Sequence, residues 1–413
     1  MAQAQSGSPQ SALEAALAGG ALDERLAALG VLCEASGAAA KPRRGTNLHI
    51  HTNESFSVFR SPSEAVWQAV REGVAVLGIN DHYTVAGHEE FRRACEFAGI
   101  RAAFSLEAVA MDRAAERERT LLNDPDNPGR VYLCAKGVTR YPPEGSPAEQ
   151  SLAAMRAANA RRSQEMAEKA GELIGERLGA EGPGWEQVLE LTPRGNVTER
   201  HVARAVRLRL EALAAQRRRR PAELVALLCA APPPEGAAAA GLENFIRGRL
   251  LKAGAPGFVR EGPDAFISLE DMRRLFLAFG AIPTYPVLGN PVTDGERDLA
   301  ALLDRLEAAG IHAVEVIPQR NTRQRLSEIV AAARRRRWPV FNGTEHNTPE
   351  PRPMLDPFAL HPEFEPHFAD SAAVLLGHQA RAARGEPGFL DAEGRPTVAD
   401  ARARFELFRN AGS

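Results

Sequence analysis

Cysteines are few in this sequence, and long apolar segments are lacking. The four cysteines among 413 residues are widely spaced, with no Cys-x-x-Cys pair. This spacing argues against both a disulfide framework and a cysteine-based zinc site. No apolar run approaches the ~20 residues that span a bilayer, and residues 1–10 are small and polar rather than leader-like. We therefore expect a cytoplasmic protein without a membrane partner.

An excess of either charge is also lacking. The chain has 51 Lys and Arg against 53 Asp and Glu, so no global field attracts nucleic acid. The two arginine runs, 217–220 and 334–337, follow predicted helices, where cations interact favourably with the helix dipole. Aromatic residues make up only 6% of the chain, and it has no nucleic-acid-binding motif. We predict no nucleic-acid partner.

The chain does contain an alternation of strands and helices. A predicted strand at 46–51 precedes a helix at 62–72, whose start carries the capping box Ser61-Pro-Ser-Glu64. The apolar run Val74-Ala-Val-Leu-Gly-Ile79 follows and is typical of a buried parallel strand. Similar runs predict further strands at 101–106, 131–135, 280–285, 311–317 and 338–342. The fold class is α/β, with parallel strands expected.

Two helical segments lie outside this alternation. Residues 11–36 have apolar residues at helical spacing and are split by Gly19-Gly20, which predicts a helical hairpin. Patterns rich in Ala, Arg and Leu replace the alternation between 142 and 278. We therefore predict four parts: an N-terminal helical extension (1–44), a first barrel part (45–141), a helical insertion (142–278), and a second barrel part with C-terminal helices (279–413).

Polar residues cluster at the ends of the predicted strands. His49 and His51 lie in the first strand, and Asp81-His82, Glu107 and Glu345-His346 follow three others. The carboxyl ends of parallel strands meet at one face of such folds. Histidines two apart on a strand point to the same side and can bind one ion together. This pattern predicts a divalent-metal site; the alternative is one buried, hydrogen-bonded histidine and one surface histidine.

Three segments around these residues resemble the polymerase and histidinol phosphatase (PHP) superfamily of metal-dependent phosphoesterases. They are Asn47-Leu-His-Ile-His-Thr52, Gly78-Ile-Asn-Asp-His-Tyr-Thr84 and Ser105-Leu-Glu107. The resemblance is close over 46–110 and looser over 280–350. It implies a PHP-type distorted barrel of about seven strands, related to the (β/α)₈ barrel, with up to three metal ions. The residues that match the first metal position are His49, His51, Glu107 and Glu345.

The other two metal positions of the family are altered in this sequence. The aspartate expected five residues after the second histidine is Phe56, with Glu54 as a nearby substitute. A histidine expected near 131–135 is missing, and the late His-Pro pair of the family is Tyr285-Pro286. His82 is retained, and His346 is available for the vacant metal position. We therefore expect one Mn²⁺, Zn²⁺ or Fe²⁺ ion rather than three.

The resemblance implies hydrolysis of a small phosphorylated metabolite or nucleotide by a metal-bound hydroxide. Asp81 or His82 would act as general base or would orient a ligand; the alternative is a turn pair that caps the next helix. A mononuclear amidohydrolase or deacetylase is a second hypothesis, because two histidines with two carboxylates serve that chemistry too. A non-catalytic ligand-binding protein is the third.

Substrate contacts are predicted in the insertion and at strand ends. Arg200 and His201 begin a helix after Thr198, where free N–H groups can receive a phosphate. They resemble an Arg/His element of some PHP phosphoesterases, and an ordinary charged helix start is the alternative. Three strand-end residues are further candidates: Arg320, Tyr285 and Lys136. For the first the alternative is a solvated loop position, and for the second it is packing at the barrel mouth.

Overall fold

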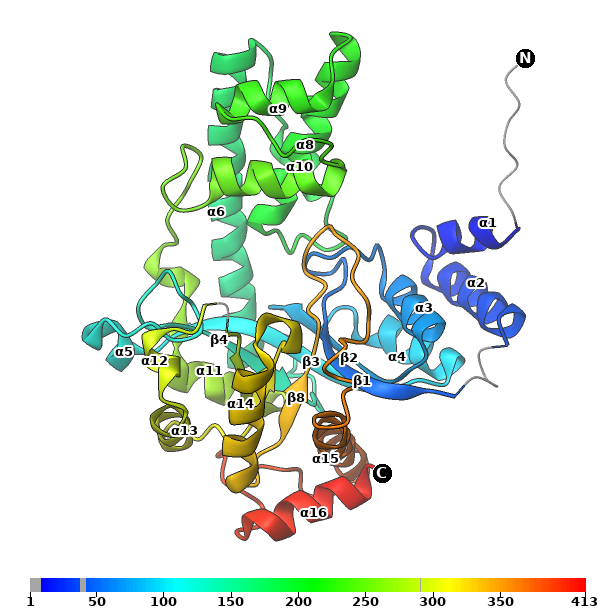
Figure 1. Ribbon diagram of the computed structural model, residues 1–413, viewed down its shortest axis with the longest axis vertical. Helices are drawn as coiled ribbons and strands as arrows, with labels where there is room; N and C mark the ends of the chain where they lie inside the picture. The colour runs from blue at the N-terminus through cyan, green and yellow to red at the C-terminus, as the bar shows by residue number, and fades with distance from the viewer. Residues whose placement is uncertain (1–8, 38–41, 290) are drawn as a thin grey trace.

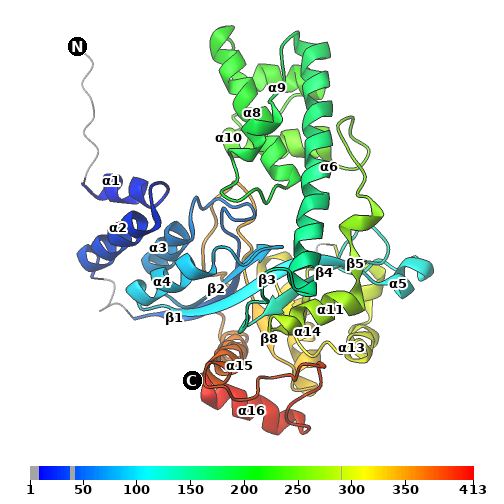
Figure 2. The same cartoon turned by 180° about the vertical axis from the view of Figure 1, so that it is seen from behind.

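The computed structural model describes residues 9–37, 42–289 and 291–413. A barrel-like sheet lies at its centre, a helical insertion stands on one end of the sheet, and the C-terminal helices lie under the other end (Figure 1). Figure 2 shows the same three layers from behind. Among the described residues, no helix is both long and apolar enough to cross a lipid bilayer.

Seven strands form the barrel in the order β1-β2-β3-β4-β6-β7-β8, and β5 pairs with β3 beside this path. This arrangement confirms the expected α/β class and the distorted barrel of about seven strands. The bounds are β1 (Arg44–Ile50), β2 (Val74–His82), β3 (Arg101–Met111), β4 (Arg130–Lys136), β5 (Ile267–Ser268), β6 (Ile282–Val287), β7 (Val314–Val316) and β8 (Val340–Asn342).

The expectation that all strands run parallel is wrong at β4, which is antiparallel to both β3 and β6. An apolar run predicts a buried strand but does not encode its direction. The reversal has a consequence for the site. Arg130, at the start of β4, pairs with Met111 at the end of β3, whereas Lys136 pairs with Ser105. Lys136 is therefore deep in the barrel rather than at its mouth.

Hydrogen bonds between β1 and the segment after β8 close the barrel. The backbone N–H of Glu345 donates to the carbonyl oxygen of His49 at 2.8 Å, and Ile50 and Glu345 form a parallel bridge. Farther down, the Thr46 hydroxyl lies 2.6 Å from Asn342 Oδ1, while Asn342 Nδ2 donates to the Thr46 carbonyl. Sequence positions about 300 apart thus meet at the first histidine.

Helices pack around the outside of the sheet. The predicted cap is present at α3, where Ser61 Oγ accepts a hydrogen bond from Glu64 N at 3.0 Å, and the left-handed Gly73 ends the helix. The predicted N-terminal hairpin packs on α3 and α4. The helices on this side and around the second half are α1 (Pro9–Ala16), α2 (Leu22–Ala35), α3 (Pro62–Glu72), α4 (His88–Ala98), α5 (Arg113–Glu118), α12 (Asp294–Arg297), α13 (Leu299–Ala308) and α14 (Arg323–Arg335).

An apolar cluster fills the lower end of the barrel. Leu48, Ile282 and Phe341 are fully buried there and pack with Leu375 of α15 (Glu365–Ala383) and Phe408 of α16 (Ala401–Ala411). Burial of such side chains contributes roughly 2 kcal/mol each. Because this end is sealed by hydrocarbon, polar chemistry is confined to the interior above it and to the opposite end.

The insertion has an apolar core of its own. It is built on the long α6 (Pro147–Leu178), with α7 (Trp185–Leu189), α8 (Glu199–Gln216), α9 (Pro221–Cys229), α10 (Ala239–Ile246) and a π-helix at Arg247–Leu251. The last part of the predicted insertion packs differently. There β5 pairs with β3, and α11 (Leu269–Ala278) packs on β6 and β3 of the barrel.

We expect Gly343→Ala to destabilise the protein by roughly 3 kcal/mol, because overpacking of a closed core carries that order of cost. A Cβ at position 343 would lie 2.1 Å from His49 Cβ, at the closure of the barrel. Chemical unfolding measures the change. The matched control is Gly30→Ala in α2, where nothing lies within 4 Å of the added carbon. An unchanged midpoint for Gly343→Ala would contradict the closure described above.

Candidate metal centre

Three predicted ligand atoms converge inside the barrel. His49 Nε2 lies 3.1 Å from His51 Nε2 and 3.1 Å from Glu107 Oε2, and His51 Nε2 lies 3.3 Å from the same oxygen. Donor atoms each ~2.0 Å from a tetrahedral ion are roughly 3.3 Å apart. Glu107 Oε2 is buried and receives no hydrogen bond from any described residue. The spacing and the chemistry of these atoms therefore fit a divalent metal ion.

Strand geometry brings these three residues together. His49 lies in β1, and His51 follows directly after the last residue of that strand, so the two histidines are two positions apart. The pairing of β1 with β2 shifts register between Asn47 and Ile50. Glu107 pairs across the β2–β3 ladder with His82, at the same end of the sheet. The predicted pairing of strand-end residues thus holds for His49, His51 and Glu107, which are all buried.

A hydrogen-bonded chain supports the second histidine. His51 Nδ1 lies 3.1 Å from Ser55 Oγ, and that hydroxyl donates to Asp81 Oδ1 at 2.6 Å. Thr52 donates to Asp81 through both its N–H and its hydroxyl. Since the Ser55 proton goes to Asp81, His51 donates through Nδ1 and keeps a lone pair on Nε2. Burial lowers the pKa of His51 to about 3, so this imidazole is neutral near pH 7.

Asp81 and His82 were the predicted catalytic pair, and only the side chain of His82 lies beside the ligand atoms. Its ring centroid is 4.5 Å from that of His51, and its Nδ1 is 3.8 Å from Glu107 Oε2. That Nδ1 atom is buried and has no hydrogen-bond partner among the described residues. Asp81 instead holds the loop after β1, and burial raises its pKa to about 6.

Glu345 reaches the site through its backbone, while its carboxylate is held by Arg320. The guanidinium makes two contacts with the carboxylate, one of them 2.9 Å long. Among the described residues, His49, His51 and Glu107 offer ligand atoms within 4.8 Å of one another, and Glu345 belongs to no such group. Arg320 thus pairs with an anion as predicted, but with one of the protein's own.

The backbone at this point is unusual. Glu345 and His346 have φ values of 65° and 54°, a left-handed conformation that is uncommon outside glycine and is concentrated at functional sites. The imidazole of His346 contacts Thr344 Oγ1 at 2.8 Å and the Arg352 carbonyl at 3.0 Å. Both of its ring nitrogens are therefore engaged away from the three ligands. Glu54, the substitute considered for Phe56, is ion-paired with Arg194.

Two charged residues beneath the ligands were not recognised from the sequence as part of the metal site. Glu315 of β7 lies 2.9 Å from His49 Nδ1, and Lys136 Nζ lies 2.6 Å from the other oxygen of Glu315. Both side chains are fully buried. The available signal was a glutamate within the apolar run 311–317, since a charge in a buried strand needs a partner. Lys136 was predicted as a substrate contact, but it lies below the site.

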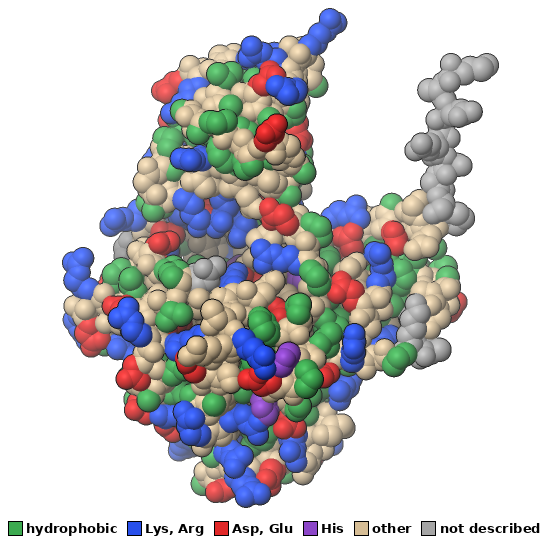
Figure 3. All heavy atoms as spheres, in the orientation of Figure 1, with side chains coloured by type: hydrophobic (Ala, Val, Ile, Leu, Met, Phe, Trp, Pro, Cys, Tyr) green, Lys and Arg blue, Asp and Glu red, His purple; other side chains and the backbone are tan. Residues whose placement is uncertain are grey.

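A cavity of about 170 Å³ lies between the barrel mouth and the insertion. Cations predominate over acids in its lining, and Figure 3 shows Lys and Arg side chains where the insertion meets the barrel. His82 and Asn347 contribute from the barrel side. The charged residues that line the cavity are Arg130, Arg162, Arg200, Arg247, Lys252, Glu199 and Glu261. Four of these five cations are ion-paired with Glu199 or Glu261. The cations still outnumber the acids, and this excess of positive charge suits an anionic ligand above the candidate metal centre.

Arg200 and His201 have different environments. Arg200 lines this cavity, its guanidinium carbon is 5.7 Å from the Phe56 ring, and no ion pair to it is found in the described part of the chain. Burial, with Arg247 nearby, lowers the pKa of Arg200 to about 10. His201 instead accepts a hydrogen bond from Thr198 N at 3.1 Å and caps its own helix.

Tyr285 lies on the outer side of the sheet. Its side chain is fully buried in the apolar cluster of the second half of the barrel, and its hydroxyl donates to Glu296 Oε1 at 3.0 Å. Tyr285 is thus a packing residue, but it packs outside the barrel rather than at the barrel mouth, where the alternative had placed it. Burial raises the pKa of Glu296 to about 7. Tyr285 and Glu296 form a hydrogen-bonded pair that is remote from the three ligands.

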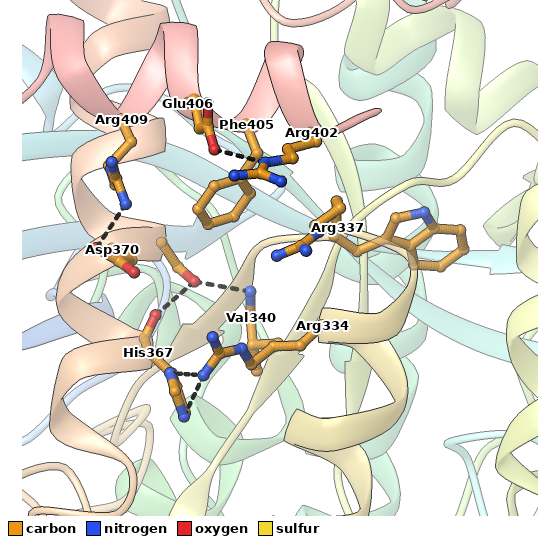
Figure 4. Close-up of a pocket in the computed structure, with 11 residues that line it drawn as sticks. Arg334, Arg337, Val340, His367, Asp370, Arg402, Phe405, Glu406 and Arg409 are labelled. Atoms are coloured by element: carbon orange, nitrogen blue, oxygen red, sulfur yellow. Dashed lines mark hydrogen bonds and ion pairs between the residues drawn. The ribbon is translucent and has the colours of Figure 1, made fainter. Parts of the chain in front are cut away.

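A second cavity, of about 90 Å³, lies among α14, α15 and α16 (Figure 4). Two of its arginines are already paired with acids of the same cavity, Arg402 with Glu406 at 2.9 Å and Arg409 with Asp370 at 3.9 Å. None of the predicted site residues lines it. The predicted site residues therefore lie away from this cavity.

We expect Glu296→Gln to change the pH dependence of stability. A folded-state pKa of about 7, above the ordinary 4.5, means that stability falls as pH rises between these values. The ionised carboxylate then costs about 3 kcal/mol above pH 7. Relative to the natural protein, the glutamine variant should gain about that much between pH 4.5 and pH 8 in urea unfolding. Glu270→Gln, at an exposed position, is the control and should leave the pH dependence of stability unchanged. If the stability of Glu296→Gln varied with pH in the same way as that of the natural protein, the raised pKa of Glu296 would be contradicted.

Comparison with solved structures supports the same architecture. A protein from Bifidobacterium adolescentis, described as a metal-dependent phosphoesterase, is similar with a TM-score of 0.53 and 20% identity, over 78% of this chain and 96% of that one. An amidohydrolase from Chromobacterium violaceum, solved with bound sulfate and no metal, has a TM-score of 0.51 and 18% identity, over 79% and 96%. No protein-family profile and no curated protein matches the chain. The likeness shows a shared fold, whose solved neighbours are hydrolases.

Proposed function

We propose that the protein is a metal-dependent hydrolase of the PHP superfamily that cleaves a small phosphorylated metabolite or nucleotide in the cytoplasm. The observation that carries the proposal is the convergence of His49 Nε2, His51 Nε2 and Glu107 Oε2, at 3.1–3.3 Å from one another. With both imidazoles neutral, three buried acceptor atoms at that spacing repel one another, and a divalent cation between them would remove that repulsion. A metal-dependent phosphoesterase is also among the structural neighbours.

In this proposal the chain's own residues divide the work. His49, His51 and Glu107 hold the ion, which would supply Lewis-acid activation of water and polarise a phosphoryl oxygen. Asp81 orients His51 through Ser55, and His82 is placed to accept or donate a proton beside the ligands. The arginine-rich cavity above them binds the anionic substrate and excludes bulk water.

A single ion fits the residues present better than three. Phe56, where the family has an aspartate, packs against His201 and Arg204. Tyr132, near the place of the missing histidine, lines the cavity, and burial raises its pKa, so its phenolate is not available as a ligand. Both vacant positions therefore present side chains that bind a divalent ion poorly.

A mononuclear amidohydrolase is the second candidate, favoured by the amidohydrolase from Chromobacterium violaceum among the neighbours. The same three ligands can activate water toward an acyl carbon. A panel of phosphomonoesters, cyclic phosphodiesters and N-acyl compounds, assayed with Mn²⁺, Zn²⁺ and Fe²⁺, separates the two candidates. Turnover of N-acyl compounds alone would replace the phosphoesterase proposal.

We expect Glu107→Gln to lower affinity for a divalent ion by more than about 100-fold and to abolish hydrolysis, because the neutral amide is a poorer metal ligand. Titration calorimetry and the hydrolase assay measure the two effects. Glu89→Gln, on the exposed face of α4, is the control and should behave like the natural protein. Full affinity in Glu107→Gln would remove this residue from the metal centre.

We expect Arg200→Met to raise KM for a phosphorylated substrate by roughly 10-fold with a smaller change in kcat, because a charged hydrogen bond to the ground state is lost. Steady-state kinetics separate the two constants. Arg220→Met, 84% exposed on the insertion, is the matched control. If KM is unchanged, the cavity beneath the insertion is not where the phosphate binds.

A further inference from the structure

The barrel holds a buried charged pair directly beneath the candidate metal centre. The side chains of Lys136 and Glu315 are each 0% exposed. Removing two charges from water costs several kcal/mol per ion, and apolar side chains of similar size would often be at least as stable. Stability alone therefore does not account for a lysine and a glutamate at this depth, where hydrocarbon fills the layer below.

Glu315 acts on the first histidine through the ring nitrogen that faces away from the metal centre. Its Oε2 lies 2.9 Å from His49 Nδ1. A carboxylate at that nitrogen accepts a hydrogen bond, which places the ring proton on Nδ1 and leaves the lone pair on Nε2. Asn80 Nδ2 lies 2.9 Å from that same Nε2, and its amide N–H donates to the Nε2 lone pair. The imidazole is thus presented to His51 and Glu107 in the form that binds a metal.

Lys136 fixes both the carboxylate and the backbone of the histidine strand. Its Nζ lies 2.6 Å from Glu315 Oε1 and donates to the carbonyl oxygen of Leu48 at 2.8 Å. Leu48 immediately precedes His49, within the stretch where the β1–β2 register shifts. One ammonium therefore joins β4, β7 and β1 at the residue next to the ligand.

A second set of possible ligand atoms, from His49, Cys134 and Glu315, lies in the same place. The ammonium of Lys136 already provides the positive charge beside Glu315. The Cys134 thiol in turn donates a hydrogen bond to Glu315 Oε2 at 3.2 Å. In this deeper group the ammonium of Lys136 therefore takes the place that a second metal ion would occupy.

We propose that Lys136 and Glu315 form a positioning pair that sets the tautomer and the orientation of His49, so that its Nε2 is ready to bind the metal. The inference rests on the proposed metal-dependent function and adds residues that act through a ligand. Ligand-orienting partners of this kind contribute roughly 10- to 100-fold in metal affinity.

Three variants separate positioning from charge balance: Lys136→Met, Glu315→Gln and the two combined. Each single change leaves one buried charge without its partner and should lower the unfolding temperature. The double variant removes both charges and should recover most of that loss. The side-chain amide of glutamine at position 315 can donate as well as accept a hydrogen bond, so it would no longer fix the tautomer of His49.

Calorimetric titration with Mn²⁺ or Zn²⁺ gives the deciding readout in the double variant. We expect its metal affinity to remain roughly 10- to 100-fold below that of the natural protein although its stability has recovered. Natural affinity in a folded double variant would overturn the inference, because charge balance alone would then explain the pair.

The unaltered protein provides a test that does not depend on any variant folding. A zinc-bound crystal structure should show His49 coordinated through Nε2, with Nδ1 still at hydrogen-bond distance from Glu315. Coordination through Nδ1 would overturn the inference while leaving the metal-dependent function intact. If the natural protein binds no divalent ion in the titration, the proposed function fails, and the positioning role fails with it.

Discussion

Closure of the barrel at His49 is the contact on which the rest of the structure depends. The His49 carbonyl accepts the Glu345 N–H, and a glycine at position 343 lets the two backbones approach closely. Because the ligand sits at the seam, the same hydrogen bonds that complete the barrel also fix the direction of its imidazole. The left-handed conformation of Glu345 is tolerated because its backbone N–H donates to the His49 carbonyl and its carbonyl accepts from the His51 N–H.

The interior of the barrel is layered by polarity. Hydrocarbon seals the lower end, a buried ion pair lies above it, the three ligand atoms come next, and an arginine-rich cavity opens beneath the insertion. Each layer limits what the next can do. The sealed end keeps water from reaching the ion pair from below, and the arginine-rich cavity lies on the opposite, polar side of the three ligand atoms.

The seven barrel strands, the helical hairpin and the convergence of the two histidines with Glu107 could be predicted, because strand ends and period-two spacing are local properties of the sequence. The short β5 was missed, since it lies within the segment predicted as a helical insertion. The direction of β4 could not, since an apolar run is the same read either way. Glu345 was predicted to bind the metal through its carboxylate, but a left-handed backbone turns that carboxylate to Arg320, away from the three ligand atoms. Glu315 was overlooked because its partner, Lys136, comes from another strand.

The insertion has a consequence for how the chain is made. Strand β1 is synthesised early, but its partner residues near 345 come about 300 residues later. The seam is therefore among the most non-local contacts in the molecule, and such contacts form slowly. The insertion buries a core of its own meanwhile and can shorten the effective loop between the two barrel halves. The final orientation of His49 is thereby deferred until residues near 345 have been synthesised, so binding of an ion at the proposed metal centre would follow closure of the barrel.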